Sequence, residues 1–163
     1  MTTAPRRQGT WLIVASFLLA FMLTVMPLPE WARAFRPEWS ALVLIYWCMA
    51  LPHRVGVGTA WVVGLLLDVM TGTLLGQHAL GLSVIAYLTL LLHQRIRVFP
   101  VRQQAMTVLV MLLLYQLLLL WVRGITGHPP TSWTYWTASL SSTILWPWTY
   151  ILMREARRRY KVA

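Results

Sequence analysis

Long apolar runs alternate with short polar segments along the whole chain. Within the runs, apolar residues do not alternate with polar ones as they do in strands of a membrane barrel, so the pattern predicts helices. Most runs approach the roughly 20 residues that a helix needs to cross hydrocarbon. We predict an all-α, polytopic membrane bundle, a single domain over residues 1–163, with six transmembrane helices at 11–28, 39–52, 55–70, 76–92, 105–122 and 135–153.

Two of these runs leave alternatives open. The second, Trp39 to Leu51, would be about 20 Å long as a helix, against about 30 Å of hydrocarbon. It either extends into its flanks or does not cross fully. The first run could be a signal peptide, because Ala32-Arg33-Ala34 resembles a cleavage site. We expect it to be retained as a span, since it is long for a signal sequence and five more runs follow.

Composition supports a membrane protein. Hydrophobic residues make up 58% of the chain and charged residues only 11%, against about 25% charged in ordinary soluble domains. The net charge of +10 would suggest nucleic acid in a soluble protein. Here we expect no nucleic-acid partner, because arginines in membrane-protein loops set topology and meet anionic lipid headgroups. The single cysteine, Cys48, excludes an intrachain disulfide.

Basic residues gather in alternate loops. With six spans, one side of the membrane carries eleven of them: Arg6, Arg7, Arg54, Arg95, Arg97, Arg102, Arg154, Arg157, Arg158, Arg159 and Lys161. The other side carries three: Arg33, Arg36 and Arg123. Because Lys and Arg concentrate in cytoplasmic loops, this asymmetry predicts a multi-pass inner-membrane protein with both termini in the cytoplasm.

Asp68 is the one acidic residue inside an apolar run, where a carboxylate is costly and needs an explanation. It follows Arg54 by 14 residues, or about 21 Å of helix, which places it towards the outer end of the third span. It could relay protons or cations, although such relays usually use several acids. It could pair with one of four cations: Arg123, His78, Arg33 or Arg36. The interpretation we favour is a structural anchor that accepts hydrogen bonds from Thr71, Thr73 or the free amides that open the fourth helix.

Small residues recur at four-residue spacing around Asp68, a pattern that lets helix backbones approach closely. They are Gly56, Ala60, Gly64, Gly72 and Gly76. This face either packs within the bundle or docks a partner's transmembrane helix. Four further residues are expected to be anchors at the inner boundary: His53, Arg54, His93 and Arg95.

The chain lacks the residue sets that known catalytic and cofactor sites need. No cluster of His, Cys and acids has metal-ligand spacing, and no glycine-rich phosphate loop is present. No serine is accompanied by the histidine and acid that a nucleophile–base–acid set requires. We therefore expect no metal, no cofactor and no enzymatic activity.

Several motifs resemble the MreD family of rod-shape-determining proteins, from about Trp11 to Tyr160. The more specific ones are the Gly64-Leu65-Leu66-Leu67-Asp68 core and the loop from Tyr87 to Pro100. The others are Arg36-Pro37-Glu38-Trp39, Leu44-Ile45-Tyr46-Trp47, Pro52-His53-Arg54 before Gly56-x-Gly58, Leu75-Gly76-Gln77-His78-Ala79-Leu80 and Leu145-Trp146-Pro147-Trp148.

The resemblance implies a non-enzymatic component of the elongasome, which builds the lateral peptidoglycan wall of rod-shaped bacteria. It implies direct binding of the single-span protein MreC and links to RodA, its partner transpeptidase and MreB. It also implies a six-helix fold like that of the substrate-binding subunits of energy-coupling-factor (ECF) vitamin transporters. The alternative function is a transporter subunit or lipid-substrate permease with an outer polar pocket, built from Asp68, Gln77, His78 and Arg123.

Overall fold

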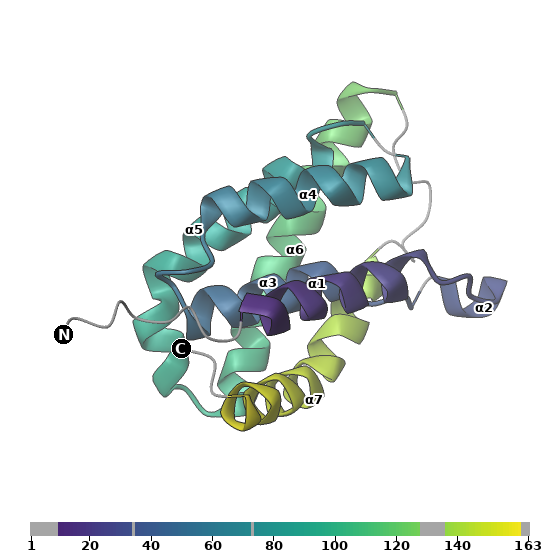
Figure 1. Ribbon diagram of the computed structural model, residues 1–163. Helices are drawn as coiled ribbons and strands as arrows, with labels where there is room; N and C mark the ends of the chain where they lie inside the picture. The colour runs from purple at the N-terminus through teal and green to yellow at the C-terminus, as the bar shows by residue number, and fades with distance from the viewer. Residues whose placement is uncertain (1–9, 34, 73, 128–135, 161–163) are drawn as a thin grey trace.

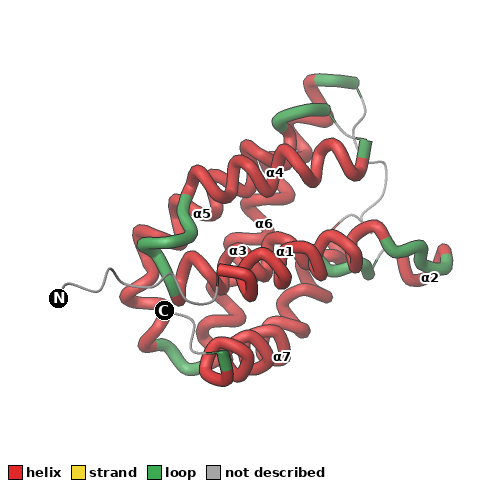
Figure 2. The backbone as a smooth tube through the Cα atoms, in the orientation of Figure 1, coloured by secondary structure: helices red, strands yellow, loops and turns green. Residues whose placement is uncertain are grey.

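The computed structural model describes residues 10–33, 35–72, 74–127 and 136–160, and these residues form helices joined by short connections (Figures 1 and 2). The helices are α1 (Thr10–Val25), α2 (Glu30–Arg33), α3 (Trp39–Ala50), α4 (Val57–Thr71), α5 (Gln77–Val98), α6 (Val101–Ile125) and α7 (Thr137–Arg159). No strand occurs in the described ranges. The predicted all-α class is confirmed, and each of the six apolar runs contains one helix.

The short helix α3 is the centre of the bundle. All of its residues after Trp39 are buried, and it packs against α1, α5, α6 and α7. A helix that is apolar almost all round has no face suited to water and is expected in a core. The run that is shortest in the sequence is therefore the most enclosed element of the fold.

Four of the other helices form two packed pairs, α4 with α5 and α6 with α7, and α1 packs singly on α3. The α4 and α5 pair has the most extensive interface, and α6 packs against α5 on one side and α7 on the other. Helix α1 lies along α3, and in Figure 1 these two lie between the α4–α5 pair and α7. Three of the interfaces, α4–α5, α5–α6 and α6–α7, join helices that are consecutive in sequence, as short connections favour.

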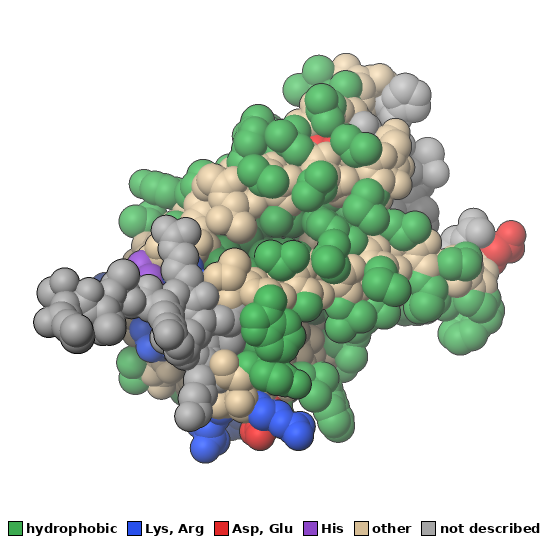
Figure 3. Space-filling model, viewed as in Figure 1, with side chains coloured by type: hydrophobic (Ala, Val, Ile, Leu, Met, Phe, Trp, Pro, Cys, Tyr) green, Lys and Arg blue, Asp and Glu red, His purple; other side chains and the backbone are tan. Residues whose placement is uncertain are grey.

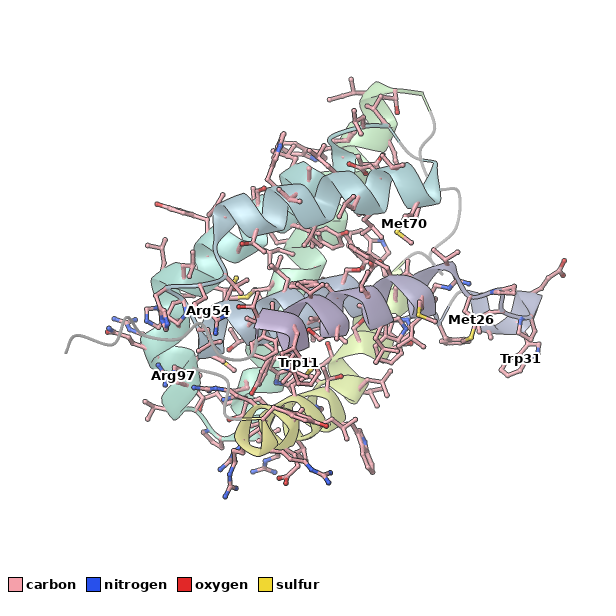
Figure 4. The ribbon with its side chains drawn as sticks, in the orientation of Figure 1. Trp11, Met26, Trp31, Arg54, Met70 and Arg97 are labelled. Carbon is pink, nitrogen blue, oxygen red and sulfur yellow. The ribbon has the colours of Figure 1, made fainter. Side chains whose placement is uncertain are left out.

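The start of α1 and the end of α7 meet at one end of the molecule. The rings of Trp11 and Tyr160 pack edge to face with centroids 4.9 Å apart. The Arg54 guanidinium, between α3 and α4, donates a hydrogen bond to the Thr10 hydroxyl at the same end. Figure 4 shows Arg97 there too, whereas Met26 and Met70 lie towards the opposite end.

The spans predicted at 76–92 and 105–122 leave residues 93–104 as a basic loop, and this prediction is wrong. Helix α5 continues to Val98 and α6 begins at Val101, so only Phe99 and Pro100 separate them. Arginines in the last turn of a helix interact favourably with its negative dipole end, which explains why Arg95 and Arg97 continue α5 instead of ending it. The segment between the first and second predicted spans also differs from a simple loop, because it contains the short helix α2.

Two of the described helices, α5 and α6, are long and apolar enough to cross a membrane by themselves. Helices α1, α3 and α4 are apolar but shorter, with 12 to 16 residues each. Helix α7 is longer, but it carries Pro147 and ends in arginines. The bundle of apolar helices fits a membrane protein. The count of six spans and the likeness to ECF subunits remain predictions.

Candidate functional site

The carboxylate of Asp68 lies at the N-terminus of the following helix, α5. Its Oδ2 accepts the backbone N–H of Gly76 at 2.8 Å, and its Oδ1 accepts that of His78 at 2.9 Å. Amides in the first turn of a helix have no partner within it, and the positive dipole end favours an anion. Asp68, only 1% exposed, thus supplies from α4 the cap that α5 lacks. These are the free amides that the sequence predicted as its partners.

The connection between α4 and α5 explains why Asp68 can reach that position. Gly72 ends α4 with φ +69°, and Gly76 precedes α5 with φ +99°. Side chains other than glycine rarely adopt such left-handed angles. A Cβ at either position would meet open space, so these two glycines shape the turn and do not form a packing face. The four-residue ladder is therefore interrupted at this turn, and a role of either glycine in contacts with a partner stays a prediction.

The remaining small residues bring α4 against α5. A Cβ on Gly64 would lie 2.2 Å from the Ala79 Cα, so the two backbones are in direct contact there. Ala60 is fully buried one turn earlier, and Gly56 faces the Leu90 side chain at 3.7 Å. This face is already occupied inside the chain, so it is not free to dock a partner's helix.

The imidazole of His78 completes the anchor. Its Nδ1 lies 2.7 Å from Asp68 Oδ1, and its ring lies 6.3 Å from that of Tyr115 on α6, centroid to centroid. Gly81, one turn along α5, gives Tyr115 room, because a Cβ there would lie 2.7 Å from that ring. The sequence prediction missed Gly81 and Tyr115. The only signal was a glycine inside an apolar run, one turn from a histidine.

Further buried polar contacts join the same end of the bundle. The Ser139 hydroxyl on α7 donates to the Gln116 amide oxygen on α6, and both residues are buried. Ser142 Oγ accepts the backbone N–H of Glu38 at 2.8 Å, which ties α7 to the start of α3. These residues were also missed, because a polar residue inside an apolar run does not reveal its partner.

Of the four cations predicted as possible partners of Asp68, the structure places some near it and others elsewhere. His78 is in contact with it. Arg36 donates instead to the carbonyls of Thr24 and Met26, where it neutralises the negative end of α1. The Arg33 side chain and Thr73 lie outside the described residues. Arg123, partly buried on α6, is close enough to act electrostatically on both His78 and Glu38.

Glu38 is a titratable group of this end whose pKa departs clearly from its ordinary value. Burial raises the pKa of its carboxyl from 4.5 to about 7, although the positive charges of Arg123 and Arg36 lower it. A carboxyl with this pKa changes its charge near neutral pH. It lies just before α3, outside the apolar helices.

The predicted inner-boundary anchors lie at the opposite end. His53 and Arg95 are exposed, whereas Arg54 and His93 are partly buried. Arg54 binds Thr10, and Nδ1 of His93 lies 2.6 Å from the Leu90 carbonyl oxygen. The four side chains therefore do not form a shared site.

Chemically, the Asp68 site holds helices together. The hydrogen bonds of its carboxylate engage groups of the chain itself. Among the residues that the structure describes, no three His, Cys, Asp or Glu side chains lie close enough to hold a metal ion. Its geometry is that of a structural anchor, and a role in binding a partner stays a prediction.

The comparisons with known proteins identify the family. The family model described as rod shape-determining protein MreD matches residues 5–156. This chain belongs to the MreD family. It is also 34% identical over 153 residues to the rod shape-determining protein MreD of Haemophilus influenzae, an alignment that covers 92% of this chain and 93% of that protein. No solved structure matches the chain. Membership makes it a membrane-associated protein that determines rod shape, as the motifs predicted.

Proposed function

We propose that this protein is a non-enzymatic scaffold of the elongasome in the bacterial inner membrane. It binds MreC directly through transmembrane helices and, with RodA, its partner transpeptidase and MreB, helps control lateral peptidoglycan synthesis. The observation that carries the proposal is the MreD family match over residues 5–156, nearly the whole chain. Six spans with both termini in the cytoplasm are part of the proposal.

The surface of the bundle supports a role within the membrane. Many exposed side chains on its helices are large and apolar, among them Met22, Val69, Val110 and Ile144 at 64% exposure or more. Figure 3 shows apolar side chains spread over one face of the bundle. Soluble proteins rarely expose so much contiguous apolar surface. With short connections, the chain offers partners mainly these helix faces. Because α5 covers the Gly64 face, a partner's helix is expected on a face that is exposed in the chain.

Co-purification tests the proposal. A tagged copy of the protein, expressed from its own promoter and extracted in mild detergent, is expected to retain MreC at a fixed ratio. Its depletion is expected to turn rods into spheres. A tagged polytopic protein of similar abundance, unrelated to the cell wall, serves as the control. Normal rod shape after depletion would overturn the shape role, whereas loss of shape without MreC in the purified sample would overturn direct binding alone.

The alternative, a substrate-binding transporter subunit or permease, has less support from the geometry. It would use Asp68, Gln77, His78 and Arg123 as an outer polar pocket. Two of these, Asp68 and His78, contact each other, and Asp68 also accepts two backbone N–H groups at the start of α5. Only Gln77 offers a buried amide nitrogen without a hydrogen-bond partner in the described part of the chain. Saturable binding of a small molecule by the purified protein would favour this alternative.

A further inference from the structure

A basic pocket opens at the end of the bundle where α3, α5 and α7 come together. Its volume is about 390 Å³, and it is lined by Tyr46, Met49, Ala50, Arg97, Tyr150, Arg154 and Arg157. Figure 4 labels Arg97 at this end, and Figure 3 shows Lys and Arg side chains gathered near the end of α7. Three guanidinium groups thus line one pocket, and none of the described residues in its wall is acidic.

The pocket is built into the fold. Tyr46 is buried on α3, and its hydroxyl lies within hydrogen-bonding reach of Arg157. The ring of Tyr150 packs edge to face on that of Tyr46 with centroids 5.9 Å apart, and it also contacts Trp146. Tyr150, Arg154 and Arg157 follow one another at helical spacing on α7 and therefore share one face. Two tyrosine rings and arginines from two helices therefore line a defined concave site.

We propose that this pocket binds the phosphate group of one anionic phospholipid. Guanidinium groups present planar pairs of N–H donors that match phosphate oxygens. A volume of about 390 Å³ is roughly ten times the share of one water molecule in the liquid, so it suits a headgroup better than a bare ion. Three arginines without an acid favour a headgroup that carries no ammonium, which selects phosphatidylglycerol over phosphatidylethanolamine.

A lipid fits the surroundings better than an acidic segment of a protein. The flank of α7 next to Tyr150 is apolar and exposed at Ile151, with an exposed fraction of 58%. Acyl chains can lie along such a flank while the headgroup fills the pocket. An acidic peptide would leave this apolar surface uncovered. The proposal requires only that the bundle lies in a membrane, and it is independent of MreC.

Native mass spectrometry of the full-length protein in detergent tests the site. Phosphatidylglycerol and phosphatidylethanolamine with identical acyl chains are added in turn. We expect one phosphatidylglycerol to be retained per chain, with an affinity about tenfold or more above that for phosphatidylethanolamine. The double variant Arg154→Gln/Arg157→Gln is expected to lose this preference. The matched control Arg158→Gln/Arg159→Gln removes the same charge from the same helix, outside the pocket, and is expected to keep it.

A second pair covers the case in which loss of Arg157 unfolds the protein. Arg97→Gln lines the pocket from α5, and Arg95→Gln is its control two residues away. Equal losses in the pocket and control variants would show only a diffuse basic rim and would overturn the proposal. Inorganic phosphate that displaces the lipid at millimolar concentration would indicate a free-phosphate site. A glutamate-rich peptide that binds through the same arginines, where phosphatidylglycerol does not, would reassign the pocket to a protein partner.

Discussion

At the scale of single residues, Asp68 shows how a buried carboxylate is accommodated in an apolar bundle. Two backbone amides and one imidazole, all from the start of α5, surround its oxygens. The cost of burying the carboxylate is offset because those amides would otherwise lack partners. The residue is therefore needed as a hydrogen-bond acceptor, which makes a prediction about its substitutions.

Asp68→Asn is expected to be milder than Asp68→Leu. Asparagine keeps one acceptor oxygen and loses about 1–2 kcal/mol of unfolding free energy, whereas leucine leaves both amides without this acceptor and loses about 3–5 kcal/mol. Denaturant titration in detergent measures the two losses. Rod shape in cells that carry each variant as the sole copy gives the functional readout. If both variants stay folded and both abolish rod shape, the negative charge itself is required.

Glu38 makes a prediction about pH. Because burial raises its pKa from 4.5 to about 7, the folded protein holds a proton that the unfolded chain releases between these values. Folding is therefore favoured at low pH, and stability is expected to fall as pH rises from about 5 to about 8. Thermal unfolding in detergent at a series of pH values measures this dependence.

Glu38→Gln should flatten that fall, since glutamine stays neutral throughout. Glu155→Gln, at an exposed position near the end of α7, is the matched control and should leave the curve unchanged. A pH dependence that is the same in the native protein and in Glu38→Gln would assign it to another group.

At the scale of elements, the contact between α4 and α5 depends on one missing side chain. Gly64→Ala would place a Cβ 2.2 Å from the Ala79 backbone, so the helices must move apart. We expect a loss of about 1–3 kcal/mol, typical of overpacking. Gly58→Ala is the control on the same helix, because its Cβ would meet open space. There alanine is expected to be neutral or to stabilise by up to about 1 kcal/mol. Equal melting temperatures for both variants would contradict the close contact.

The same elements show what a sequence can predict here. Apolar runs located the six longer helices, because a helix in an apolar environment needs a continuous stretch of such residues. Helix ends were less predictable. The arginines after residue 92 suggested that a loop begins there, but α5 continues to Val98. Four-residue spacing identified Gly64 as a close contact. It could not show that Gly72 and Gly76 adopt left-handed angles, or that Gln116 and Ser139 meet, since these depend on the path of the chain in three dimensions.

At the scale of the whole molecule, the open question in the sequence was whether the short run at Trp39 to Leu51 crosses the membrane. Helix α3 has 12 residues, about 18 Å of helix against about 30 Å of hydrocarbon. The other helices enclose it, so its length need not match the bilayer by itself. The Arg36 contacts lie at one end of α3 and the Arg54 contact at the other. We therefore expect the two ends of α3 to lie on opposite sides of the membrane.

Cysteine labelling tests this expectation. In a Cys48→Ala background, which removes the one native cysteine, a reporter at Glu30 precedes α3 and one at the exposed His53 follows it. A membrane-impermeant maleimide is expected to label Glu30→Cys in intact spheroplasts and His53→Cys only after permeabilisation. Arg95→Cys, near the end of α5, should behave like His53→Cys because six spans place both on the cytoplasmic side. If Glu30→Cys and His53→Cys react under the same condition, α3 does not cross, and the six-span arrangement is wrong.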